Sequence, residues 1–256
     1  MTTASSTMPG LARYALALGD DALVLSHRFG EWVSLAPQLE EDVALANIGL
    51  DLLGQGRSLL TYAGKVEGEG RDEDALAYLR EERDFLSCHL VELENGDFAF
   101  TIARMLVFST YQHALYSGLM SSSDAMLAAI AAKAVKEVDY HRDHATEWTL
   151  RLGDGTDESH RRLQAAVDEV RKHADELFDT AWIPAELLES GAAVDVSMLH
   201  DGCRRSWESV MERATLALPE VVPAVGGGRR GVHDVRMGYL LAEMQHLHRS
   251  HPGASW

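Results

Sequence analysis

The distribution of proline constrains this chain more than any other feature of its sequence. No proline occurs from residue 38 to residue 183. A proline inside a helix costs about 3 kcal/mol, so this stretch is where long helices can run. The alternating patterns typical of strands are absent from it. The prolines of the chain are Pro9, Pro37, Pro184, Pro219, Pro223 and Pro252.

Apolar residues recur at steps of three and four along most of the chain, which is the period of a helix face. Asp97 and Asp124 precede two of these patterns and are good helix N-caps. Long helices joined by short turns predict an all-α fold, an antiparallel helical bundle with additional C-terminal helices. The predicted helices span residues 11–33, 39–66, 73–92, 97–121, 124–152, 157–181, 196–217 and 234–249.

The rest of the chain is expected to be short or irregular. We expect residues 1–10 to be a disordered N-terminus and residues 11–256 to form a single domain. Residues 219–231 contain three consecutive glycines and two prolines, and they are predicted to form the one long loop.

Composition excludes several classes of protein. The chain carries 40 acidic against 23 basic residues, a net charge of −17, which argues against nucleic acid or an anionic membrane as the main partner. Its longest apolar run, residues 125–132, is too short to cross a bilayer. Two cysteines in separate segments do not make a disulfide framework. The first ten residues do not resemble a signal peptide, so we expect a cytoplasmic protein.

A helical bundle of this kind can hold a pair of iron ions, but the required motif is incomplete here. Such a site takes Glu from two helices and a Glu-x-x-His pair from each of the other two. The long predicted helices of the bundle, within residues 11–152, contain no Glu-x-x-His. Asp51 is followed three residues later by Gly54, and Val138 stands three residues before His141, with Glu137 one place out of step. No Asp or Glu occurs from residue 98 to residue 123.

Several sequence blocks identify a resemblance that covers essentially the whole chain after residue 10. The chain resembles the C subunits of the ring-1,2-phenylacetyl-CoA epoxidases of aerobic phenylacetate degradation. The blocks are LGDDALVLSHRFGEW at 18–32, LEEDVALANIGLDLLGQGR at 39–57, ENGDFAFTIAR at 94–104, AKAVKEVDYH at 132–141, RLGDGTD at 151–157 and LAEMQHLHR at 241–249.

This resemblance implies a ferritin-like subunit, a degenerate paralogue of the catalytic A subunit with which it pairs. In the family the di-iron centre lies on the A subunit, and a flavin and iron-sulfur reductase subunit delivers the electrons. One atom of dioxygen then enters the aromatic ring of phenylacetyl-CoA to form the 1,2-epoxide. By the resemblance, no cofactor is expected on this chain.

The resemblance also places the metal-ligand positions of the catalytic relative on this chain. The first Glu falls near Asp20 or Asp21, and the first Glu-x-x-His falls on Asp51 and Gly54. The third carboxylate falls near Ser109. The second Glu-x-x-His falls on Val138 and His141, with Glu137 beside it. At least three of six ligands are thus missing, so no catalytic or metal-binding residue is predicted, only the remnants Asp51, Glu137 and His141.

Each remnant has two interpretations. Glu137 and His141 are either half of a site for one metal ion or, as we favour, a buried pair hydrogen-bonded to each other. Asp51 is predicted to belong to a buried polar seam with Asn47 and Gln55 that fixes the helix register.

The glycine-rich segment is also open to two interpretations. Arg229 and Arg230 follow the three glycines directly. They are candidates for binding the phosphates of coenzyme A, because guanidinium groups match phosphate oxygens. The alternative, which we favour, is a mobile loop exposed to solvent.

Three functional hypotheses follow. We favour a non-catalytic structural subunit of the epoxidase complex. The second is a ferritin-like di-iron oxygenase that is active on its own with unusual ligands, which the acid-free segment opposes. The third is a bundle that stands alone as a binding or storage module.

Overall fold

Four long helices form the centre of the molecule in a computed structural model, which describes residues 8–254. They are α1 (Gly10–Gly30), α2 (Leu39–Glu67), α5 (Phe98–Leu119) and α6 (Ala125–Gly153). Helix α1 pairs with α2 and α5 with α6, and α2 also contacts α6. The described residues contain no strand. The fold is an all-α, ferritin-like bundle, as the sequence predicted.

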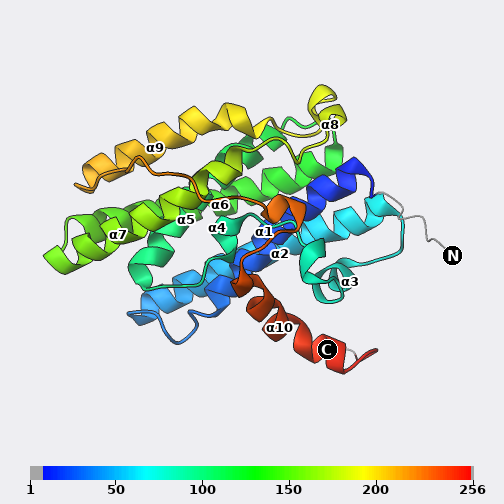
Figure 1. Cartoon of the computed structure of the whole chain (residues 1–256), viewed down its shortest axis with the longest axis horizontal. Helices are drawn as coiled ribbons and strands as arrows, with labels where there is room; N and C mark the ends of the chain where they lie inside the picture. Colours follow the sequence, from blue (N-terminus) through cyan, green and yellow to red (C-terminus); the bar gives the residue numbers. More distant parts are fainter. Residues whose placement is uncertain (1–7, 255–256) are drawn as a thin grey trace.

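Shorter elements connect and surround the bundle (Figure 1). The segment between α9 and α10 crosses the bundle in an extended form before α10 begins. These elements are α3 (Glu73–Tyr78), η1 (Glu82–Asp84), α4 (His89–Glu92), α7 (Asp157–Ala174), η2 (Asp175–Phe178), α8 (Ala185–Glu189), η3 (Val196–Leu199), α9 (His200–Arg213), η4 (Gly228–Arg230) and α10 (Val235–Ser250).

The predicted helix starts are confirmed by their capping hydrogen bonds. The side chain of Asp97 accepts a bond from Phe100 N at 3.0 Å, at the start of α5. Asp124 accepts from two backbone N–H groups at the start of α6. These caps stabilise the helices because the first N–H groups of a helix have no partner within it. The predicted bounds of the four long helices agree with the structure to within a few residues.

The prediction of one helix over residues 73–92 was wrong. The structure divides this segment into α3, η1 and α4, with irregular backbone between them. Leu86 N donates to Asp20 Oδ2 at 2.8 Å, and Cys88 N donates to Asp21 Oδ1 at 2.8 Å. Buried carboxylates of α1 therefore take backbone N–H groups that a continuous helix would have used internally.

The packing of α1 against α2 is unusually close. A Cβ atom added at Gly56 would lie 3.2 Å from the backbone N of Leu23 and 3.4 Å from the carbonyl of Gly19. Glycine thus allows the two helix backbones to approach each other. The buried hydrophobic residues form one cluster that extends from α1 to α10. In residues 8–254 no helix has the length and hydropathy needed to cross a membrane.

Candidate functional site

The middle of the four-helix bundle is polar, and three helices contribute to it. Gln55 of α2 donates from Nε2 to Glu137 Oε2 of α6 at 3.0 Å. Its Oε1 accepts from Gln112 Nε2 at 3.1 Å and from the Tyr116 hydroxyl at 3.4 Å, both on α5. Gln55, Gln112 and Tyr116 are all buried. We call these four residues the central network.

The central network continues as a polar seam between α2 and α6. His141 Nε2 lies 3.1 Å from Asp51 Oδ2, and His144 Nε2 lies 3.1 Å from Glu41 Oε2. His141 is buried, whereas the Asp51 side chain is 36% exposed. Burial lowers the pKa of His144, and the nearby Glu41 carboxylate opposes this shift. The seam joins two antiparallel helices by polar pairs, which fixes their register.

The predicted polar seam is confirmed for Asp51 and Gln55, but Asn47 is exposed and does not belong to it. The expectation that Glu137 and His141 bond to each other was wrong. Each side chain bonds across to α2 instead, Glu137 to Gln55 and His141 to Asp51. Glu137 also forms an ion pair with Lys133, whose Nζ lies 3.7 Å from Glu137 Oε1.

The donor set at this centre does not fit a pair of iron ions. Gln55, Gln112 and Tyr116 offer carboxamide and phenol groups where carboxylates and imidazoles are needed. Ser109 Oγ on α5 is buried with no hydrogen-bond partner in the described part of the chain. Within residues 8–254, no cluster of three or more His, Cys, Asp or Glu side chains could hold a metal ion.

Each of the two buried carboxylates of α1 forms an ion pair with an arginine. Asp20 pairs with Arg80, and its Oδ2 lies 3.0 Å from Arg80 Nη1. Asp21 pairs with Arg229, with Oδ2 2.6 Å from Nη2 and Oδ1 3.1 Å from Nη1. All four side chains are buried. Asp20 and Asp21 therefore neutralise guanidinium groups rather than presenting oxygen atoms to the bundle centre.

The prediction of a mobile, solvated loop was wrong for Arg229. Its Nη1 also donates to the carbonyls of Ala17 at 3.0 Å and Leu86 at 2.8 Å, and its guanidinium lies 4.6 Å from the centre of the Trp182 ring. Burial opposes the charge of Arg229, but the Asp21 carboxylate raises its pKa. Arg229 is thus a buried anchor and cannot reach a phosphate in solvent.

Arg230 differs from its neighbour. It is exposed, and its Nη2 donates to the carbonyl of Gly226 at 3.2 Å. Of the two predicted phosphate-binding candidates, only Arg230 presents its guanidinium to solvent.

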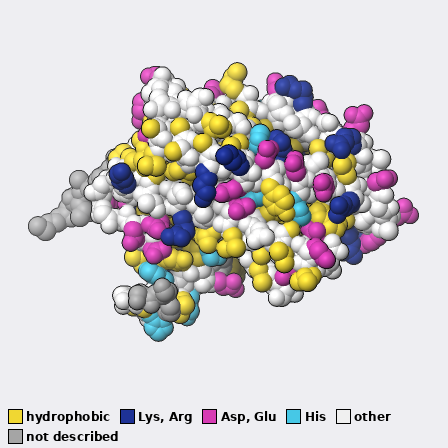
Figure 2. All heavy atoms as spheres, turned by 180° about the vertical axis from the view of Figure 1, so that it is seen from behind, with side chains coloured by type: hydrophobic (Ala, Val, Ile, Leu, Met, Phe, Trp, Pro, Cys, Tyr) yellow, Lys and Arg dark blue, Asp and Glu magenta, His cyan; other side chains and the backbone are white. Residues whose placement is uncertain are grey.

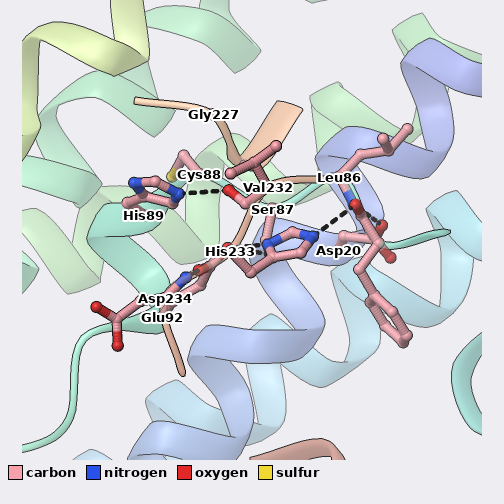
Figure 3. A network of polar contacts seen from close by, with 12 residues as sticks. Asp20, Leu86, Ser87, Cys88, His89, Glu92, Gly227, Val232, His233 and Asp234 are labelled. Atoms are coloured by element: carbon pink, nitrogen blue, oxygen red, sulfur yellow. Dashed lines mark hydrogen bonds and ion pairs between the residues drawn. The ribbon is translucent and has the colours of Figure 1, made fainter. Parts of the chain in front are cut away.

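Figure 3 shows a second set of anchors for residues 219–234, which we call the strap. His233 Nδ1 lies 2.7 Å from Glu92 Oε1, and its Nε2 lies 2.9 Å from the carbonyl of Phe85. His89 Nε2 contacts the Val232 carbonyl at 2.7 Å. The side chains of His233 and Glu92 are fully buried. A carboxylate on one ring nitrogen and a carbonyl on the other favour the doubly protonated imidazole.

The glycines of the strap are required by close packing. A Cβ atom at Gly228 would lie 1.9 Å from the carbonyl oxygen of Ser87. Gly231 has φ +71°, and a Cβ atom there would lie 2.2 Å from the carbonyl of Arg83. Glu176 Oε1 accepts from the N–H groups of Gly227 at 2.9 Å and Gly228 at 3.2 Å. Sequence reasoning missed this role, although glycine also marks places where backbones approach closely.

Two comparisons relate the sequence of this chain to known proteins. A family model described as "Phenylacetic acid catabolic protein" matches residues 1–256. The chain is 47% identical over 253 residues to the C subunit of the 1,2-phenylacetyl-CoA epoxidase of Escherichia coli (strain K12), covering 97% of this chain and 100% of that relative. The chain therefore belongs to the phenylacetic acid catabolic protein family.

Proposed function

We propose that this chain is a non-catalytic structural subunit of a phenylacetyl-CoA epoxidase that acts in aerobic phenylacetate degradation. In this proposal it pairs with a catalytic A subunit in a cytoplasmic complex. The A subunit holds the di-iron centre, and a reductase subunit supplies the electrons. The proposal rests on the similarity to a C subunit over nearly the full chain.

The hydrogen bonds of the central network support a structural, non-catalytic role for this chain. Its amide and phenol groups bond to one another and to Glu137, so they satisfy buried polar atoms of three helices. Gln55, Gln112 and Tyr116 therefore hold the bundle together at the place where a catalytic relative would hold metal. The alternative, an oxygenase active on its own, would need carboxylate and imidazole ligands at this centre.

A partner subunit requires a surface, and an apolar stripe on α2 offers one. Figure 2 shows groups of hydrophobic side chains among the acidic and basic ones on the face opposite to that of Figure 1. A groove of about 300 Å³ between α1 and α2 is lined mostly by apolar atoms. Such exposed apolar patches are typical of protein interfaces. The exposed residues of the stripe and the preceding loop are Val33, Leu35, Leu39, Val43 and Leu50.

The decisive experiment is reconstitution. We expect the purified chain to show no epoxidation of phenylacetyl-CoA with reductase and NADPH, and we expect activity when the A subunit is added. Turnover by this chain without the A subunit would overturn the proposal in favour of the alternative.

The surface is tested separately by substitution. Leu50 is 64% exposed and Tyr239 on α10 is 69% exposed. We expect Leu50→Asp to abolish co-purification with the A subunit, while Tyr239→Asp, the matched control, leaves it intact. Equal co-purification of both variants would show that the partner binds elsewhere.

A further inference from the structure

A pocket of about 240 Å³ is lined by a cluster of arginines. It lies between the first turns of α1 and the segment around α3, at the end of the molecule where α1 begins (Figure 1). Four arginines line it in a chain that carries 40 acidic and only 23 basic residues. The lining residues are Met8, Arg13, Leu16, Arg71, Arg80, Arg83, Asp84 and Leu86.

Arg80 is the fixed element of this pocket. It is buried, pairs with Asp20, and lies 3.9 Å from the centre of the Phe85 ring. It also donates to the carbonyls of Leu76 and Asp84. One hydrogen on its Nη2 has no partner in the described part of the chain. Arg80 therefore contributes a fixed, buried guanidinium to the wall of the pocket.

Arg71 uses only part of its guanidinium group in hydrogen bonds within the chain. Its Nε and Nη2 donate to Glu67 at 2.8 Å and 2.6 Å, which leaves its Nη1 hydrogens without a partner in residues 8–254. Glu69 lies 4.0 Å from the same guanidinium. The pair with Glu67 holds the side chain in place and leaves one edge of the guanidinium for a further acceptor.

Arg13 and Arg83 supply charge that is not neutralised by a paired carboxylate. Arg13 donates only to the carbonyl of Arg229, at 2.8 Å, in the described residues. Arg83 is exposed, and its side chain has no hydrogen bond or ion pair in residues 8–254. Asp84 is the one acidic residue of the lining.

We propose that this pocket binds the phosphate groups of a small molecule. Guanidinium groups from α1, the α2–α3 connection and the segment after α3 converge on one concave space, and their paired N–H donors match the oxygen atoms of phosphate. A diphosphate carries more oxygen acceptors and more negative charge than a single carboxylate, so it can engage more of these donors at once. The concave shape favours a small anion over the flat surface of an acidic protein.

The test measures binding of inorganic pyrophosphate to the purified full chain by calorimetry, and it does not depend on epoxidase activity. Arg83→Ala is the main variant, because this exposed side chain has no partner to lose in the described structure. We expect it to weaken the affinity about tenfold or more, since each charge-assisted hydrogen bond is worth that much. Arg83→Glu should abolish binding. Arg213→Ala on α9, also exposed and without a partner in residues 8–254, is the matched control and should bind normally.

Binding of adenosine diphosphate and of malonate is measured in the same way. Binding of the nucleotide with the same dependence on Arg83 would show that the phosphate can belong to a larger molecule. Pyrophosphate binding that Arg83→Glu leaves unchanged, or no binding at all, would overturn the proposal. Malonate binding as strong as that of pyrophosphate would refute the assignment to phosphate, because malonate carries two carboxylates of similar spacing.

Discussion

Replacing Arg229 with methionine should strongly destabilise the protein. The substitution keeps an apolar side chain beside Trp182 but removes the guanidinium that bonds to Asp21, Ala17 and Leu86. Asp21 would keep only the N–H of Cys88 as a donor among its described partners. Leaving one member of a buried ion pair alone costs about 3 to 5 kcal/mol.

This loss is large beside the total stability of a domain, about 5 to 15 kcal/mol. For a chain of this size it corresponds to a fall in melting temperature of about 6 to 20 °C. The assay is urea unfolding of the isolated chain, followed by circular dichroism, with the midpoint and slope fitted together.

Arg230→Ala is the matched control, because this neighbouring arginine is exposed. Its effect should stay within about 0.5 kcal/mol. The double variant Asp21→Asn with Arg229→Met should recover part of the loss, because no buried charge is left unpaired. If Arg229→Met and Arg230→Ala unfold at the same urea concentration, the strap is not anchored as described and our reasoning is wrong.

Three further predictions concern the seam, the strap and metal content. Asp51→Ala and Glu137→Ala should each lower the melting temperature, and Glu137→Ala, at the more buried position, should cost up to about 1 to 3 kcal/mol of stability. Turnover per intact complex should change less than stability does. A hundredfold fall in turnover with an unchanged melting temperature would show that these residues take part in the reaction. Burial opposes the charge of His233, but Glu92 and the Phe85 carbonyl outweigh it and raise its pKa. The stabilisation by the His233–Glu92 pair is therefore complete below about pH 6.5, the pKa of unfolded histidine, and is lost as pH rises through the higher pKa of the folded state. The difference in melting temperature between wild type and His233→Asn should shrink over that pH range. A difference that stays constant with pH would contradict this prediction. The chain purified alone should carry well under one iron per molecule by elemental analysis, and two irons with the absorption of an oxo-bridged pair would refute the structural role.

The long helices follow from local information. Helical periodicity, N-caps and the absence of proline act over a few neighbouring residues, so they were sufficient to predict α1, α2, α5 and α6. The polar seam was partly predictable for the same reason, because Asp51 and Gln55 lie on the inward face of one helix. The lack of Glu-x-x-His in the long bundle helices can also be read from the sequence alone, because a sequence motif does not depend on the fold.

Contacts between distant residues could not be predicted in this way. Asp21 and Arg229 are 208 positions apart, and nothing near Arg229 in the sequence indicates a buried partner. The break in the helix predicted at residues 73–92 has the same origin, because the carboxylates of α1 bind the backbone of that segment. The glycines at 226–228 are compatible with both a mobile loop and close packing. Only the tertiary structure decides between these, because the cost of burying a charge or ordering a loop is offset by groups brought together from elsewhere in the chain.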